Sequence, residues 1–139
     1  MKKTIFLAII FLTLQGFSQS FKNGVYKVNK VVEFTWNEEH TEVEPYEYER
    51  EYLFQITDSG FRWYYQSDDT GESYSIMYIG VMKDGYDSFA VNPSSRLEIK
   101  DELAVLYFDF NGQTGWFESS IEFRDLEYLS KKPILSHEN

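Results

Sequence analysis

Residues 46–56 read Tyr-Glu-Tyr-Glu-Arg-Glu-Tyr-Leu-Phe-Gln-Ile, and this stretch decides the fold class. Apart from Arg50 and Leu53, rings and aliphatic side chains occupy the even positions, and Glu or Gln occupies the odd positions. Successive side chains of a β-strand point to opposite faces of the sheet. The stretch therefore predicts a strand with one ring-rich face and one acidic face.

The same alternation recurs along the chain. One run places five side chains on a single predicted face: Tyr26, Val28, Val32, Phe34 and Trp36. Pairs such as Asp84-Gly85 and Asn111-Gly112 separate the runs, and they tolerate the positive φ angles of type I′ hairpin turns. We predict about eight strands, at residues 24–36, 46–56, 61–66, 74–82, 86–91, 96–99, 103–110 and 114–124. Residues 125–132 are predicted to form a short helical turn or a final edge strand.

Strands that follow one another closely and are joined by tight turns pair antiparallel in chain order. The expected fold is therefore all-β, a single-domain antiparallel meander. A small up-and-down barrel is favoured, because closure of a sheet leaves no free edges for aggregation. A two-sheet β-sandwich is the alternative that the pattern leaves open.

The first residues are typical of a secretory signal peptide. Lys2 and Lys3 precede an apolar run at 4–14, and the small residues of 16–18 suit a cleavage site. The run has about half of the ~20 residues that a membrane-spanning helix needs. We expect a signal peptide at 1–18, a β-barrel domain at 19–132 and a flexible tail at 133–139. The protein is thus expected to be exported, to the periplasm or the extracellular space, with no membrane span after cleavage.

The charge balance excludes some partners. Without Lys2 and Lys3, the 13 basic residues fall to 11 against 23 acidic ones, a net charge of −12. Nucleic-acid binding draws on Lys and Arg to neutralise phosphates, so no nucleic-acid partner is expected. The chain has no Cys, which excludes disulfides and thiol chemistry.

The first and last predicted strands resemble those of lipocalin-like proteins, small exported β-barrels of the calycin group. In that group the first strand often opens with Gly-x-Trp, and a basic side chain near the end of the barrel packs on that Trp. This chain has Gly24-Val25-Tyr26 in its first strand and Arg124 near its last. The resemblance implies a barrel that holds a ligand and packing of Arg124 on Tyr26.

No motif singles out catalytic or metal-binding chemistry. The two His residues are His40, in an acidic loop, and His137, in the tail. Phosphate loops and metalloprotease motifs are absent, so the sequence predicts no catalytic residue, no metal site and no cofactor. The Glu-rich segment 38–51 is interpreted as a solvated surface, with calcium as its alternative.

The abundance of Tyr and Trp favours a binding function. Rings with polar handles need partners when they are buried, and a core that needed only bulk would contain more aliphatic side chains. We expect a non-catalytic module that holds a small apolar or aromatic ligand, or a sugar, in a ring-lined interior. The ligand-binding residues predicted for it are Trp36, Trp63, Tyr65, Tyr78 and Trp116. The alternative is an acidic interaction module, such as an inhibitor of a basic extracytoplasmic enzyme, that uses its charge to attract a cationic protein.

Overall fold

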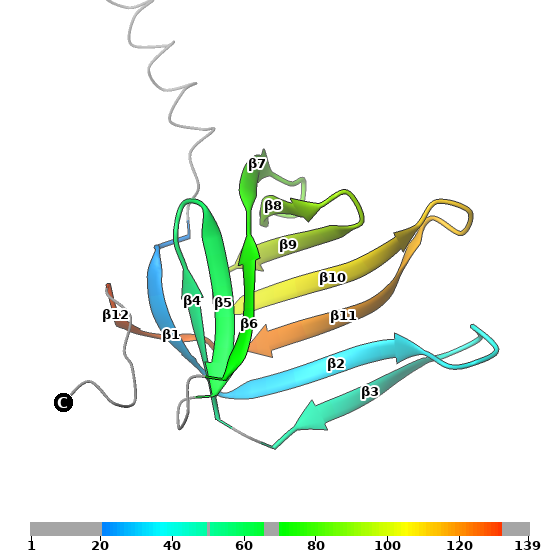
Figure 1. Cartoon of the computed structure of the whole chain (residues 1–139), viewed down its shortest axis with the longest axis horizontal. Coiled ribbons are helices and arrows are strands. Elements are labelled where there is room, and N and C mark those ends of the chain that lie inside the picture. The colour runs from blue at the N-terminus through cyan, green and yellow to red at the C-terminus, as the bar shows by residue number, and fades with distance from the viewer. Residues whose placement is uncertain (1–20, 50, 66–69, 132–139) are drawn as a thin grey trace, which may run out of the picture.

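The structure, a computed structural model, describes residues 21–49, 51–65 and 70–131 (Figure 1). Within these ranges the chain forms twelve β-strands and no helix, which confirms the predicted all-β class. The predicted signal peptide at 1–18 and the predicted tail at 133–139 lie outside the described residues.

The strands form two antiparallel sheets. Sheet A has the order β12-β1-β4-β5-β6, with β1 (Gly24–Val28), β4 (Tyr52–Ile56), β5 (Gly60–Tyr65), β6 (Gly71–Ser75) and β12 (Glu127–Ser130). Sheet B has the order β3-β2-β11-β10-β9-β8-β7, with β2 (Lys30–Trp36), β3 (Val43–Tyr48), β7 (Met77–Val81), β8 (Asp87–Asn92), β9 (Ser95–Lys100), β10 (Leu103–Asn111) and β11 (Trp116–Arg124). Neither sheet closes on itself into a barrel, and the two-sheet sandwich fits this arrangement.

Three of the eight predicted runs, 24–36, 46–56 and 74–82, contain two strands each, one in each sheet, and the last run continues past 124 into β12 of the other sheet. The chain passes from one sheet to the other at Asn29, between β3 and β4, at Ile76 and at 125–126. The eight predicted runs therefore contain eleven strands, and β12 in the segment 125–132 is the twelfth. The segment after Arg124 is the edge strand β12 and not a helical turn.

Two of these corners are joined by hydrogen bonds. The backbone N–H of Asn29 donates to the carbonyl oxygen of Arg124 at 3.2 Å, and its Nδ2 donates to the carbonyl oxygen of Asp125 at 2.6 Å. Asp125 has a φ of +55°, a left-handed conformation that Asp tolerates better than most residues. The first and last runs thus bend together as they leave sheet B.

The hydrophobic core lies between the sheets. The rings of Phe54 in sheet A and Phe123 in sheet B are 5.3 Å apart, and neither side chain is exposed. Aliphatic side chains such as Leu97 and Leu106 complete the core from sheet B. The predicted ring-rich face of residues 46–56 is confirmed for Tyr52, Phe54 and Ile56, which belong to this core, but it is wrong for Tyr46, which is 63% exposed.

The predicted common face from Tyr26 to Trp36 is wrong. Tyr26 and Val28 point into the core, but beyond the corner at Asn29 the core residue is Val31. A change of sheet at a single residue shifts the alternation by one position. Phe34 and Trp36 consequently lie outside the core cluster, on the side of β2 that carries Val32.

The predicted Asn111-Gly112 turn also differs in detail. The glycine with positive φ is Gly115, at +79°, and its N–H donates to the carbonyl oxygen of Asn111 at 2.8 Å. The Asn111 side chain accepts from the N–H of Gln113 at 2.9 Å, which favours a longer loop. Gly85, by contrast, has the predicted positive φ, at +90°.

Candidate functional site: an aromatic groove at the tip of sheet B

Two of the five predicted ligand-binding residues pack in the core. Trp63 lies 5.1 Å from Tyr52 and 5.4 Å from Phe123 between ring centroids, and Tyr65 lies 4.7 Å from Tyr52. Rings at these separations are in contact with one another. Trp63 therefore packs between the two sheets, and Tyr65 packs against Tyr52 of the same sheet.

A third predicted residue, Tyr78, faces a buried carboxylate. Its hydroxyl donates to Oδ1 of Asp87 at 3.0 Å, and its ring contacts Phe89 at 5.3 Å. The second oxygen of Asp87 accepts the backbone N–H of Phe21 at 2.9 Å, and Asp87 has no exposed surface. Burial, followed by the hydrogen bond to Asp87, raises the pKa of Tyr78 to about 12. This hydroxyl thus satisfies an internal acceptor.

The structure brings the remaining two residues together on the surface. Trp36 on β2 and Trp116 on β11 have ring centroids 6.4 Å apart and an interplanar angle of 60°. Both line a groove of about 250 Å³, which we call the tryptophan groove. Its other lining residues are Phe34, Val43, Tyr107, Gly115, Phe117, Glu118, Ser119 and Ser120. Trp116 is 62% exposed, so one wall of the groove is an accessible indole ring.

Neighbouring hairpins build this groove. Strands β2 and β11 pair from Thr35–Ser119 to Lys30–Arg124, and the β2–β3 and β10–β11 hairpins extend side by side at one end of sheet B (Figure 1). The indole Nε1 of Trp36 donates to the carbonyl oxygen of Phe117 at 3.1 Å. This bond orients the Trp36 ring against the neighbouring strand.

A polar cluster lies beside the two tryptophans. Glu118 accepts hydrogen bonds from Asn111 Nδ2 at 3.0 Å and from His40 Nε2 at 3.1 Å. The Asn111 bond, followed by the His40 bond, lowers the pKa of Glu118, so this residue is a carboxylate at neutral pH. The His40 ring stacks on Trp36 at 6.5 Å. The groove thus combines ring faces with a fixed negative charge.

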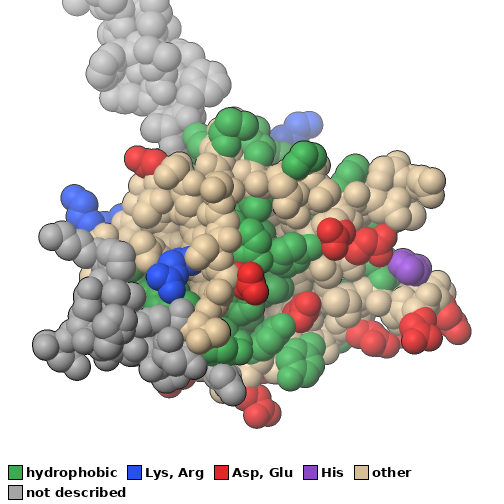
Figure 2. All heavy atoms as spheres, viewed as in Figure 1, with side chains coloured by type: hydrophobic (Ala, Val, Ile, Leu, Met, Phe, Trp, Pro, Cys, Tyr) green, Lys and Arg blue, Asp and Glu red, His purple; other side chains and the backbone are tan. Residues whose placement is uncertain are grey.

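The loop that carries His40 is organised locally. Asn37 Oδ1 accepts the N–H of Thr41 at 2.9 Å, and the N–H of His40 donates to the Asn37 carbonyl oxygen at 3.0 Å. His40 has a φ of +55°, which directs the chain back toward β3. Figure 2 shows acidic side chains around the histidine at this end of the molecule.

Arginines cover rings elsewhere around the groove. The Arg124 guanidinium lies 5.9 Å from the ring centroid of Phe34, and Arg96 lies 5.4 Å from that of Phe117. Each arginine is paired with a carboxylate, Arg124 with Glu122 at 3.1 Å and Arg96 with Glu98 at 3.2 Å.

The lipocalin resemblance implies that Arg124 packs on Tyr26. In the structure, the ring of Tyr26 contacts Phe21 and Tyr128 instead.

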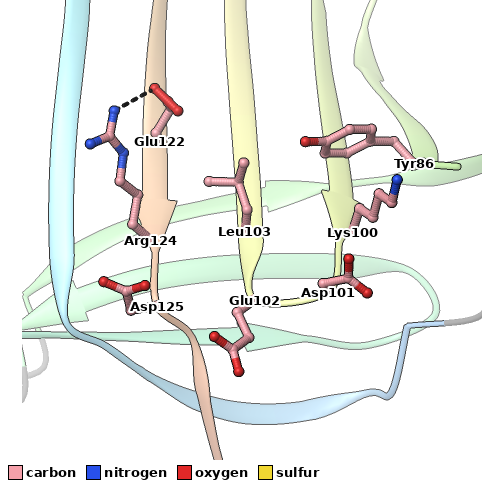
Figure 3. Close-up of a pocket in the computed structure, with 8 residues that line it drawn as sticks. All are labelled: Tyr86, Lys100, Asp101, Glu102, Leu103, Glu122, Arg124 and Asp125. Atoms are coloured by element: carbon pink, nitrogen blue, oxygen red, sulfur yellow. Dashed lines mark hydrogen bonds and ion pairs between the residues drawn. The ribbon is translucent and has the colours of Figure 1, made fainter. Parts of the chain in front are cut away.

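Other hollows offer less chemistry. One of about 390 Å³, at the end of β9–β11, is lined by charges of both signs, including Lys100, Glu122 and Arg124 (Figure 3). Lys100 Nζ donates to the Asp84 carbonyl oxygen at 2.7 Å, and Arg124 is paired with Glu122. Lys100, Glu122 and Arg124 thus have partners within the protein. A second, of about 410 Å³, is mainly apolar, and Ile79 and Phe110 line it.

Within the described ranges, no group of three or more His, Asp or Glu side chains is placed to hold a metal ion. The same part of the chain contains no helix with the length and hydropathy needed to cross a membrane.

Comparison with family models, with curated proteins and with solved structures finds no match to this chain.

Sequence reasoning missed part of the groove. It selected Trp36 and Trp116 as tryptophans, but it did not predict that Glu118 and His40 lie beside them. His40 and Glu118 are 78 residues apart, and only the pairing of β2 with β11 brings them together. The available signal in the sequence is that His40 and Glu118 each lie in or next to a hairpin tip.

Proposed function

We propose that this protein is an exported, non-catalytic binding module that holds a small ligand against Trp36 and Trp116. The observation that carries the proposal is the 62% exposure of Trp116 beside a second tryptophan in a defined groove. Large exposed rings next to polar groups are typical of binding surfaces. The sequence placed the ligand in the interior, whereas the interior rings contact one another.

The groove suits a ligand with one apolar or aromatic face. A ligand that buries roughly 100 Å² of ring surface gains about 2.5 kcal/mol from that area alone. Glu118, Ser119 and Ser120, which carry polar side chains, are among the residues that line the same groove. These groups orient a small molecule without any catalytic residue.

We also propose that the eight runs form a barrel in the lipocalin-like manner. The support is that consecutive runs pair throughout, and the last run pairs with the first through β11–β2 and β12–β1. The chain changes sheet at four corners, so each sheet by itself stays open. Export rests on the predicted signal peptide at 1–18.

The experiment is a titration of tryptophan fluorescence with three probes: benzyl alcohol, a methyl glucoside and choline. At least one probe should give a saturable change that Trp116→Leu abolishes. Tyr46→Leu is the matched control, because Tyr46 is 63% exposed but does not line the groove. The absence of a saturable change with every probe, together with no ligand in native mass spectra of protein from its own host, would contradict the proposal.

A second candidate function is the acidic interaction module. Strand β3 favours it, because Val43 to Glu47 are exposed and β3 pairs only with β2 in sheet B. Glu44 and Glu47 on this edge would attract a basic protein surface. Such association weakens as salt rises, since the screening length is about 8 Å at physiological ionic strength. Binding of a basic protein that is insensitive to salt would contradict this candidate.

A further inference from the structure

We propose that the tryptophan groove binds a cationic ligand, an alkylammonium group such as trimethylammonium. This inference rests on the proposed binding function and specifies the chemical class of its ligand. Three observations support it: the accessible ring faces, the charges around them, and the way the protein uses neighbouring rings.

The first observation is that aromatic ring faces line the groove. The face of an aromatic ring carries negative electrostatic potential, and the indole of Trp attracts cations most strongly among the side chains. Trp36 and Trp116 both line the groove, with ring centroids 6.4 Å apart and an interplanar angle of 60°, and the His40 ring stacks on Trp36. A compact, weakly hydrated cation needs one accessible ring face, and the indole of Trp116, which is 62% exposed, provides it.

The second observation is that the protein places its own arginines over two neighbouring rings of the groove. Phe34 and Phe117 also line the groove, and each has an arginine of the protein over it. In the part of the chain that the structure describes, no Lys or Arg lies over the ring of Trp36 or Trp116. The accessible indole of Trp116 therefore remains available to a cation from outside.

The charges give the third observation. Glu118 lines the groove, and His40 and Asn111 hold its carboxylate in place. The adjoining loop and β3 add four further acids: Glu38, Glu39, Glu42 and Glu44. The two nearby arginines are paired with Glu98 and Glu122, and His40 lies 3.1 Å from Glu118. The surplus charge at this tip is negative, which favours a cation over a neutral or anionic ligand.

Calorimetric titration with choline and with 3,3-dimethylbutanol tests this directly. The second compound has the same shape, with carbon in place of the charged nitrogen. We expect choline to bind roughly tenfold more tightly, the size of a cation–π contribution at a partly desolvated site. Raising the salt concentration should weaken choline binding and leave the alcohol unaffected.

Substitutions at two positions, Trp116 and Glu118, separate the contributions of the ring and of the charge. Trp116→Leu should reduce the affinity for choline roughly tenfold, and Trp116→Phe should lie between wild type and Leu, because Phe attracts cations less strongly. Glu118→Gln should weaken choline and not the alcohol. Glu72→Gln, an exposed acid on β6 in sheet A, is the matched control and should change neither.

The outcomes distinguish this inference from the proposed function. Equal affinity for the two compounds, or tighter binding of the alcohol, overturns the cationic ligand but retains the groove as a binding site. If choline gives no saturable heat while benzyl alcohol or the glucoside binds, the inference also fails and the proposed function stands. If none of the probes binds, the inference is overturned, and the proposed function is overturned with it when native mass spectra of protein from its own host also show no ligand.

Discussion

The hydroxyl of Tyr78 donates a 3.0 Å hydrogen bond to Oδ1 of Asp87, a carboxylate with no exposed surface. The other oxygen of Asp87 accepts the backbone N–H of Phe21, whose ring lies 4.9 Å from that of Tyr26. The first described residue of the chain is therefore tied to strands β7 and β8 through one buried acid.

Tyr78→Phe should destabilise the protein, because it removes a donor from a buried acceptor. The expected loss is about 1–3 kcal/mol in the free energy of unfolding, measured by urea denaturation. Tyr46→Phe provides the control, since Tyr46 is exposed, and its cost should be below ~0.5 kcal/mol. Equal small costs for both variants would mean that the Asp87 bond contributes nothing.

Stability should fall steeply in alkaline solution. Burial raises the pKa of Tyr26, Tyr78 and Tyr107 from 10.0 to about 12. The folded state thus holds these protons over a range in which the unfolded chain releases them. Their contribution to stability is complete below pH 10 and is lost as the pH rises toward 12. Tyrosine absorbance and unfolding followed against pH should change together, and free titration of these tyrosines near pH 10 in the folded protein would contradict this.

The β10–β11 loop offers a matched pair of substitutions. Gly115→Val places a β-branched residue at a φ of +79° and should cost about 1 kcal/mol or more. Gly112 lacks a positive φ, and a Cβ there meets no atom within 4 Å, so Gly112→Val should cost less than ~0.5 kcal/mol. The reverse order in thermal unfolding would restore the Asn111-Gly112 turn that the sequence predicted.

The alternation of residues 46–56 gives another contrast. Phe54 is fully buried between the sheets, and Phe54→Ala should cost about 3–5 kcal/mol. Glu49 is exposed, and Glu49→Ala should cost less than ~0.5 kcal/mol. Chemical denaturation of both variants checks the assignment, which would be inverted if Glu49→Ala were the more damaging change.

The sequence predicted the strand runs well, because period-two alternation and hairpin turns are local signals. All eight predicted runs contain strands of the structure, and residues 125–132 contain β12. The corners were not predicted. A single residue such as Asn29 or Ile76 separates strands of different sheets, and no local propensity marks it as a change of sheet. The missed corner at Asn29 also explains why Trp36 was assigned to the face of Tyr26.

The sequence predicted which types of residue form the candidate site, but it did not predict where in the fold the site lies. Abundant rings indicated binding, and Trp36 and Trp116 do meet in one groove. Trp63 packs in the core, although all three tryptophans look equivalent in an alternating pattern. Which ring is exposed depends on the pairing of β2 with β11, a contact between residues far apart in the chain.

The chain contains three tryptophans, and their indole N–H resonances test the central claim most directly. Proton–nitrogen correlation spectra are recorded while choline, benzyl alcohol or the glucoside is added. The account predicts that the resonances of Trp36 and Trp116 move saturably with at least one probe, while that of Trp63 stays in place. A ligand-induced shift confined to Trp63 would place the site in the interior and contradict the account.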